Sequence, residues 1–194
     1  VCIIESLLWV AQRTDDVFLK GKALRAYTSY LERASHPDLT VSAMVSDSPI
    51  CAHGVTFNEV GKLGALVYLY TGDKEILNAT RRGFAKLDAQ SQLASGLHSC
   101  SEHVRGNDPL DSHETCDIAD HSWALGYLLM ATGDASYADQ IERVCFNAGL
   151  GAVRDDFRAL QYFSCPNQVL CTSESNHNLW FRGEPWMAYR PNPS

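Results

Sequence analysis

A pattern that occurs three times along the chain predicts a protein built from helical hairpins. Apolar residues at helical spacing lead into a short turn, and a second apolar helical run follows that turn. The turns are Thr14-Asp15-Asp16, Thr71-Gly72-Asp73 and Thr132-Gly133-Asp134. Each ends in an Asp, which is a good N-cap for the second helix, and in two of them Gly supplies the left-handed residue that ends the first helix. Each unit is therefore predicted to be a helix, a tight turn and a second helix.

The spacing of these turns indicates how the hairpins assemble. Thr71 follows Thr14 by 57 residues and Thr132 follows Thr71 by 61 residues, a period typical of arrays of helical pairs. One closed array of this kind is the α/α toroid, in which six hairpins need about 340 residues at this period. A chain of 194 residues holds about three of them. We expect a mainly α protein that forms part of an (α/α)6 barrel, with its hairpins in residues 1–150.

The sequence changes in character after about residue 150. The runs 159–164 and 168–172 are short and rich in β-forming residues, and Pro166 and Asn167 separate them. Residues 173–194 are rich in Ser, Asn and Pro and contain Trp180 and Trp186. We expect 151–194 to form short strands and loops of the same domain, as long connections over the mouth of a site often do.

Composition and charge exclude several classes of protein. The chain has 16 Lys and Arg against 23 Asp and Glu, a net charge of −7 with no basic cluster, which argues against nucleic-acid binding. No run of about 18 apolar residues predicts a membrane span. The seven cysteines are odd in number and irregularly spaced, so no disulfide framework is expected. The N-terminus lacks an initiator Met and the features of a signal peptide, so we expect a fragment and assign no compartment.

The densest polar cluster comprises residues 99–103 and 111–117, on the connection that leads into the third hairpin. Glu114 and Cys116 are two residues apart, about 200° around a helix, so they can share a ligand only at a helix N-terminus or in an extended entry. Asp111 or Ser112 is the expected cap of such a helix. A carboxylate and a thiolate placed in this way form half of a zinc site. The alternative is that Glu114 completes a capping box and Cys116 belongs to the core.

Two further residues are candidates for chemistry. Glu102 lies in a loop, and a loop carboxylic acid that faces a cleft is a candidate general acid. The alternative is that Glu102 is an ordinary solvated side chain with no catalytic role. His53 precedes the first helix of the second hairpin, where it either binds ligand hydroxyls or satisfies a buried backbone carbonyl.

Taken together, these residues resemble glycoside hydrolase family 127, the β-L-arabinofuranosidases and their relatives, whose catalytic domain is an (α/α)6 barrel. The resemblance covers roughly residues 50–170 and is specific as a set. The segments that carry it, in chain order, are His53-Gly54-Val55, the loop residue Glu102, Glu114-Thr115-Cys116 and the run 137–147.

The resemblance implies retaining hydrolysis of a furanoside similar to an L-arabinofuranoside. In the family, one Glu and three Cys hold a zinc ion, one zinc-bound thiolate is the nucleophile, and a separate Glu is the acid and base. By position, Glu114 and Cys116 match the first two zinc ligands, and Glu102 matches the acid and base. The residues that match sugar contacts are His53, Glu142 and Tyr162. The alternatives are a helix-surface ion pair for Glu142 and a core aromatic for Tyr162.

One part of the family pattern is missing from the sequence. The family has an adjacent Cys-Cys pair, whereas Ser164 precedes Cys165 here. We expect the pair to follow Ser194, so that this chain carries half of a metal site and is inactive alone. The expected partners are a carbohydrate substrate, the remainder of the barrel and C-terminal β-domains, and neither nucleic acid nor a membrane.

Two other functions stay open at this point. One is a metal-free α/α-toroid carbohydrate enzyme, such as an epimerase or a lyase, that uses Glu102 or His53 as acid and base. The other is a helical-repeat module that binds sugar without catalysing a reaction. The zinc content of the complete protein distinguishes the metal-free enzyme from the zinc-dependent hydrolase. The substitution Glu102→Gln distinguishes the binding module from the hydrolase, because it removes turnover in the hydrolase and leaves sugar binding unchanged in the module.

Overall fold

The structure is a computed structural model that describes residues 2–32, 39–167 and 190–191. The predicted strand at 168–172, Trp180 and Trp186 lie outside these residues. The described part contains seven α-helices, the last of them continued by the π-helical turn η2 (Cys145–Gly149). The helices are α1 (Cys2–Thr14), α2 (Val17–Glu32), α3 (Val41–Val45), α4 (Gly54–Thr71), α5 (Lys74–Ser91), α6 (Thr115–Thr132) and α7 (Ser136–Val144).

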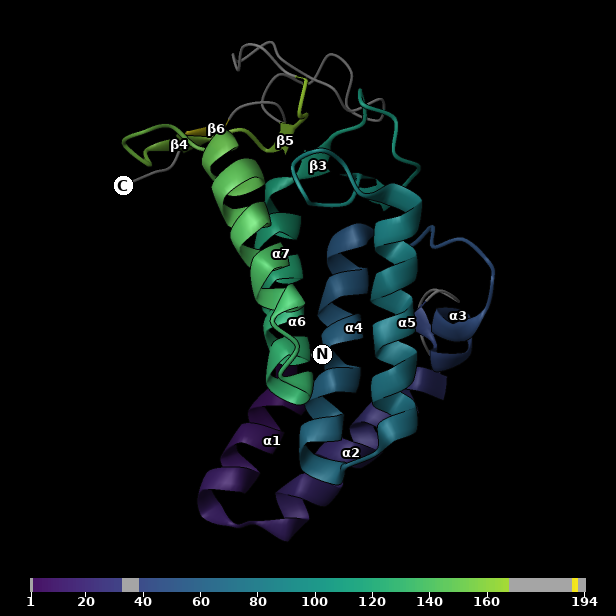
Figure 1. The fold of residues 1–194 in the computed structure, drawn as a ribbon. Coiled ribbons are helices and arrows are strands. Elements are labelled where there is room, and N and C mark those ends of the chain that lie inside the picture. The colour runs from purple at the N-terminus through teal and green to yellow at the C-terminus, as the bar shows by residue number, and fades with distance from the viewer. Residues whose placement is uncertain (1, 33–38, 168–189, 192–194) are drawn as a thin grey trace.

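The three predicted hairpins are present as α1–α2, α4–α5 and α6–α7 (Figure 1). Gly72 and Gly133 adopt the predicted left-handed conformation, with φ of +73° and +70°. Asp15 takes the same conformation in the first turn, with φ of +56°. A short polar side chain is tolerated in this region, which explains how the first hairpin manages without Gly.

The Asp and the Thr of each turn have separate structural roles. Asp73 caps α5, since its carboxylate accepts hydrogen bonds from the backbone N–H groups of Glu75 and Ile76 at 3.0 and 3.3 Å. Asp16 and Asp134 accept equivalent bonds at the starts of α2 and α7. The Thr hydroxyl of each turn donates to the carbonyl four residues earlier. The recurring side chains therefore satisfy backbone groups that a helix end leaves unpaired.

Helix α4 lies at the centre of the hairpins and is buried on nearly all sides. Two glycines allow α5 to approach it closely. A Cβ on Gly61 would lie 2.8 Å from the Phe84 ring, and a Cβ on Gly64 would collide with the hydroxyl of Thr80. The main hydrophobic core joins α4 and α5 to α6 through residues such as Phe57. This packing holds the starts of α4 and α6 side by side.

Short strands form three antiparallel ribbons at the end of the molecule where α4 and α6 begin (Figure 1). The predicted β-rich run at 159–164 supplies two of these strands, β4 (Ala159–Leu160) and β5 (Phe163–Ser164). The pairs are β1 (Cys100–Ser101) with β2 (His103–Val104), β3 (His113–Glu114) with β5 (Phe163–Ser164), and β4 (Ala159–Leu160) with β6 (Arg190–Pro191).

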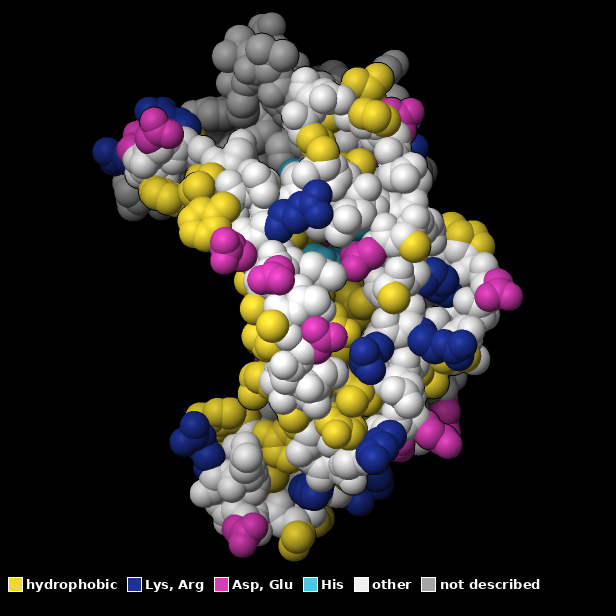
Figure 2. All heavy atoms as spheres, in the orientation of Figure 1, with side chains coloured by type: hydrophobic (Ala, Val, Ile, Leu, Met, Phe, Trp, Pro, Cys, Tyr) yellow, Lys and Arg dark blue, Asp and Glu magenta, His cyan; other side chains and the backbone are white. Residues whose placement is uncertain are grey.

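The surface carries both charged and hydrophobic side chains. In the face shown by Figure 2, Lys and Arg side chains lie scattered among acidic ones. Within the described residues, no helix is both long and apolar enough to cross a membrane. Hydrophobic side chains also reach the surface, among them Trp9 of α1 and both Trp123 and Met130 of α6. They line an open cavity of about 730 Å³ between α1, α4 and α6.

Candidate active site

Glu114 and Cys116, the two expected metal ligands, lie where β3 leads into α6. Glu114 ends β3, where it pairs with Phe163 of β5, and it is also the N-cap residue of α6. Its side chain makes no capping hydrogen bond, so neither the capping box nor a cap at Asp111 or Ser112 is present. Cys116 is the second residue of α6 and is exposed rather than part of the core. The extended entry into the helix therefore lets both side chains reach one site.

Glu102 is the tip of a tight hairpin between β1 and β2. Ser101 pairs with His103, which leaves Glu102 alone at the turn with a left-handed φ of +73°. This conformation is uncommon for a residue other than Gly. The backbone N–H of Gly54 donates to the Glu102 carbonyl at 3.0 Å, and this bond fixes the hairpin tip against the start of α4.

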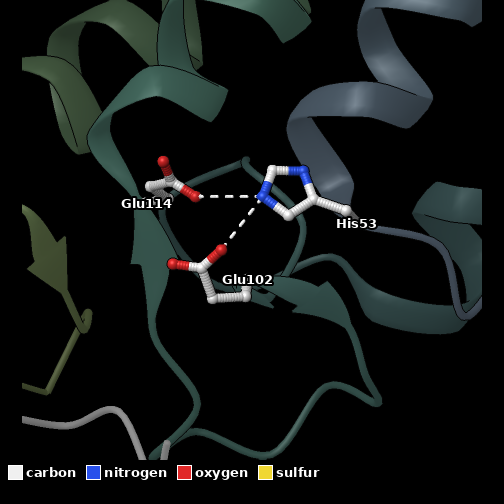
Figure 3. Close-up of side chains that lie close together, drawn as sticks. All are labelled: His53, Glu102 and Glu114. Carbon is white, nitrogen blue, oxygen red and sulfur yellow. Dashed lines mark hydrogen bonds and ion pairs between the residues drawn. The ribbon is translucent and has the colours of Figure 1, made fainter. Parts of the chain in front are cut away.

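His53 joins the two carboxylates (Figure 3). It is the N-cap of α4, where its Nδ1 accepts a hydrogen bond from the backbone N–H of Thr56 at 3.3 Å. Because Nδ1 is an acceptor, the ring proton of neutral His53 lies on Nε2. His53 Nε2 therefore donates to Glu102 Oε2 at 3.1 Å, and it lies 3.8 Å from Glu114 Oε2.

Tyr162 holds the other oxygen of Glu114. Its hydroxyl donates to Glu114 Oε1 at 2.6 Å, and its carbonyl accepts from the backbone N–H of Thr115 at 2.9 Å. Tyr162 is half-buried and serves the polar site rather than the core. Burial and the adjacent Glu114 carboxylate raise the pKa of the Tyr162 hydroxyl, so it remains a hydrogen-bond donor.

Glu142 is separate from this group. It lies exposed on α7, and the contacts described for His53, Glu102, Glu114 and Tyr162 do not include it. The structure thus brings together five of the six predicted site residues, with Cys116 next to Glu114 and Tyr162.

A buried polar floor, not predicted from the sequence, lies beneath the site. It consists of Asn58 on α4, Asp117 and His121 on α6, and His98. The Asn58 amide N–H donates to Asp117 Oδ1 at 2.6 Å, and the Asn58 amide oxygen lies 3.0 Å from His121 Nδ1. The other oxygen of Asp117, Oδ2, lies 3.1 Å from His98 Nε2. Burial lowers the pKa of His98 and raises the pKa of Asp117. Polar residues inside two otherwise apolar helices were the only sequence signal of this floor.

The donor set around Glu114 could hold a metal ion. The ligand atoms of His53, Glu102 and Glu114 lie within 4.8 Å of one another, so this group could hold a metal ion. Glu114 Oε2 is buried without a hydrogen-bond partner, which is costly unless another group compensates it. However, His53 uses Nδ1 to cap α4 and carries its proton on Nε2, so it has no free lone pair to offer.

Cys116 is the better second donor. Although Cys116 is partly exposed, the partial burial of its thiol and then the Glu114 carboxylate raise its pKa to about 12, which favours the neutral thiol in the protein without a metal. A bound cation reverses this preference, because a coordinating thiol loses its proton. The residues present therefore fit a metal held by Glu114 and Cys116.

Comparison with solved structures places the fold. A GH127 β-arabinofuranosidase aligns with a TM-score of 0.69 and 20% identity over 82% of this chain and 27% of its own. The GH127 β-L-arabinofuranosidase of Geobacillus stearothermophilus T6 aligns with a TM-score of 0.67 and 14% identity over 84% of this chain and 30% of its own. The unsaturated glucuronyl hydrolase of Streptococcus agalactiae aligns with a TM-score of 0.53 and 18% identity over 82% of this chain and 37% of its own. These likenesses confirm the predicted mainly α fold as part of an α/α barrel.

Sequence comparison identifies the family. No curated protein matches the chain in sequence. The family model described as "Beta-L-arabinofuranosidase, GH127 catalytic domain" matches residues 49–189. That match contains all six predicted site residues and extends over most of the chain, although the chain spans less than a third of the β-arabinofuranosidases it resembles. The chain therefore belongs to glycoside hydrolase family 127.

Proposed function

We propose that this site belongs to a retaining glycoside hydrolase that acts on a furanoside similar to a β-L-arabinofuranoside. The observation that carries the proposal is the position of Glu102. Its carboxylate is held by His53 beside a buried carboxylate oxygen of Glu114 that has no hydrogen bond. The family match supports the hydrolase over an epimerase, a lyase or a binding module.

Glu102 is the proposed acid and base. In the first step it gives its proton to the leaving sugar oxygen, and in the second it takes a proton from the water that releases the sugar. The N–H of His53 orients the carboxylate for both transfers. Because the hairpin tip fixes the Glu102 backbone, the carboxyl group stays in place between the two steps.

Glu114 and Cys116 are the proposed zinc ligands of this chain, together with two thiols outside it. When bound, zinc would keep its thiol ligands deprotonated at neutral pH, so that one of them can act as the nucleophile. The hydroxyl of Tyr162 holds Glu114 Oε1 and leaves Oε2 free for the metal. Such outer contacts orient a ligand and tune its donor strength.

Three residues complete the proposed binding of the substrate. From the family resemblance, we propose that His53, Glu142 and Tyr162 contact the sugar. Since the chain spans 27% and 30% of the length of the two β-arabinofuranosidases it resembles, we propose that the remaining wall of the cleft belongs to other parts of the protein. The preference for one sugar and linkage therefore lies partly outside this chain.

The substitution Glu102→Gln tests the proposal in the whole enzyme. With an arabinofuranosyl disaccharide, we expect kcat to fall about 10²- to 10⁴-fold, because the leaving sugar needs a proton. With 4-nitrophenyl β-L-arabinofuranoside, the first step needs no acid, so single-turnover release of nitrophenolate should be much less affected. The control Glu75→Gln lies beyond the far end of α4 and should leave both rates unchanged. Equal losses with both substrates, or no loss, would refute the role of Glu102.

A further inference from the structure

Cys100 is a buried thiol next to the proposed acid and base, and neither the family pattern nor the proposed chemistry gives it a role. It lies in β1, two residues before Glu102, and its side chain is fully buried. The thiol donates a hydrogen bond to the Glu102 carbonyl at 3.2 Å. That carbonyl also accepts from Gly54 N–H, so two groups hold the residue at the hairpin tip.

The start of α4 is shaped around this thiol. A Cβ on Gly54 would lie 2.5 Å from Cys100 Sγ and 2.9 Å from Cys100 Cβ. Real Cβ atoms do not approach other atoms so closely, so Gly54 is the residue that allows α4 to begin against Cys100. His53, which orients the Glu102 carboxylate, is the N-cap immediately before this glycine.

Cys100 also connects the hairpin to the polar floor. Its thiol contacts the buried carboxyl of Asp117, which the Asn58 amide holds from the other side. Burial and the nearby Asp117 and Glu114 carboxylates raise the pKa of Cys100, so the group is a neutral thiol that can donate a hydrogen bond. The floor, the start of α4 and the hairpin tip therefore meet at one side chain.

We infer that Cys100 is a positioning residue for Glu102, which it acts on through the Glu102 backbone and the start of α4. Glu102 needs this support because its left-handed backbone is strained for a residue with a side chain. A carboxyl group misplaced by about 1 Å loses up to 10²-fold in rate. The inference rests on the proposed role of Glu102 as acid and base.

The test compares Cys100→Ala with Cys100→Ser in the whole enzyme. Cys100→Ala removes the donor, and we expect kcat on a disaccharide to fall about 10-fold with KM within about twofold, because binding contacts remain. The loss should be smaller with the nitrophenyl glycoside, and the limb of the pH profile that reports the acid should move. Cys100→Ser keeps a donor and should recover most of the activity.

Cys165→Ala is the matched control. Cys165 is also a buried cysteine, and its thiol donates to the Pro109 carbonyl at 3.3 Å, yet it does not contact Glu102. We expect this variant to retain the ratio of the two activities and the pH profile. Cys100→Ala with wild-type activity, or with equal losses on both substrates like a general packing defect, would overturn the inference.

A structural readout separates this inference from the proposed function. In crystal structures, Cys100→Ala should lengthen the 3.1 Å contact between His53 Nε2 and Glu102 Oε2, and Cys100→Ser should restore it. If the wild-type enzyme cleaves no furanoside, the proposed function fails while this measurement still decides the positioning role. An unchanged contact in Cys100→Ala would reject that role. If Cys100→Ala does not fold, Cys100→Val replaces it, because Val also lacks a hydrogen-bond donor. A lengthened contact in Cys100→Val, absent from Cys165→Ala, supports the role, and an unchanged contact rejects it.

Discussion

Asp88 shows how a single buried carboxyl group sets a dependence of stability on pH. It lies in α5, and its Oδ1 is buried without a hydrogen-bond partner. Burial raises its pKa from 3.8 to about 6. Because the folded protein binds this proton more tightly than the unfolded chain does, Asp88 costs no stability well below about pH 4. The cost grows between about pH 4 and about pH 6 and stays constant above that.

Asp88→Asn is therefore expected to stabilise the protein at neutral pH. The neutral amide removes the cost of a buried charge, and the free energy of unfolding should rise by about 1–3 kcal/mol at pH 7.5. At pH 4 the gain should disappear, since Asp88 is then protonated in the folded wild type. Thermal unfolding of both proteins at the two pH values measures this difference. A gain of the same size at both pH values would show that packing, not charge, is responsible.

Among the proposed site residues, only Glu114 and Cys116 were linked to one another by their spacing in the sequence. The spacing of Glu114 and Cys116 allowed a shared site only at a helix start or in an extended entry, and the structure places both residues at the start of α6. Cys100 and Asp117 could not be assigned, because their roles depend on contacts between loops and helices distant in sequence. Glu102 was a candidate from its loop position, but its left-handed backbone depends on the hairpin around it.

At the level of helices and strands, local sequence signals identified the hairpins. The Thr and Asp of each turn act through hydrogen bonds within a few residues, so the pattern alone predicts them. The ribbon of β3 and β5 is different, since each strand has two residues and depends on a partner from a distant segment. Such short strands have no periodicity of their own, and only the run at 159–164 hinted at them.

A pair of glycines in the third hairpin tests the turn. A Cβ at either Gly133 or Gly126 would meet no other atom within 4 Å, so only backbone conformation distinguishes them. Gly133→Ala places a side chain at φ of +70° and should cost about 1–2 kcal/mol. Gly126→Ala lies within α6 and should stabilise it by about 0.5–1 kcal/mol. Chemical denaturation measures both, and changes of the same sign would contradict this explanation.

For the molecule as a whole, the described chain is one part of a larger barrel. We propose that residues 1–150 and 151–194 belong to one catalytic domain, and the pairing of β3 with β5 supports this. The exposed Trp9, Trp123 and Met130 line the open cavity between α1, α4 and α6. We propose that the remaining helices of the same barrel cover them.

The division of roles within the site depends on which residues hold the metal. The measurement that decides it is the zinc content of the whole purified enzyme and of four variants: Glu114→Gln, Cys116→Ala, His53→Gln and Glu102→Gln. We expect about one zinc ion per chain in the wild type, loss of zinc in the first two variants, and retention in the other two. Zinc that survives Cys116→Ala but is lost with His53→Gln and Glu102→Gln would contradict this division, and so would a wild-type enzyme that is active without zinc.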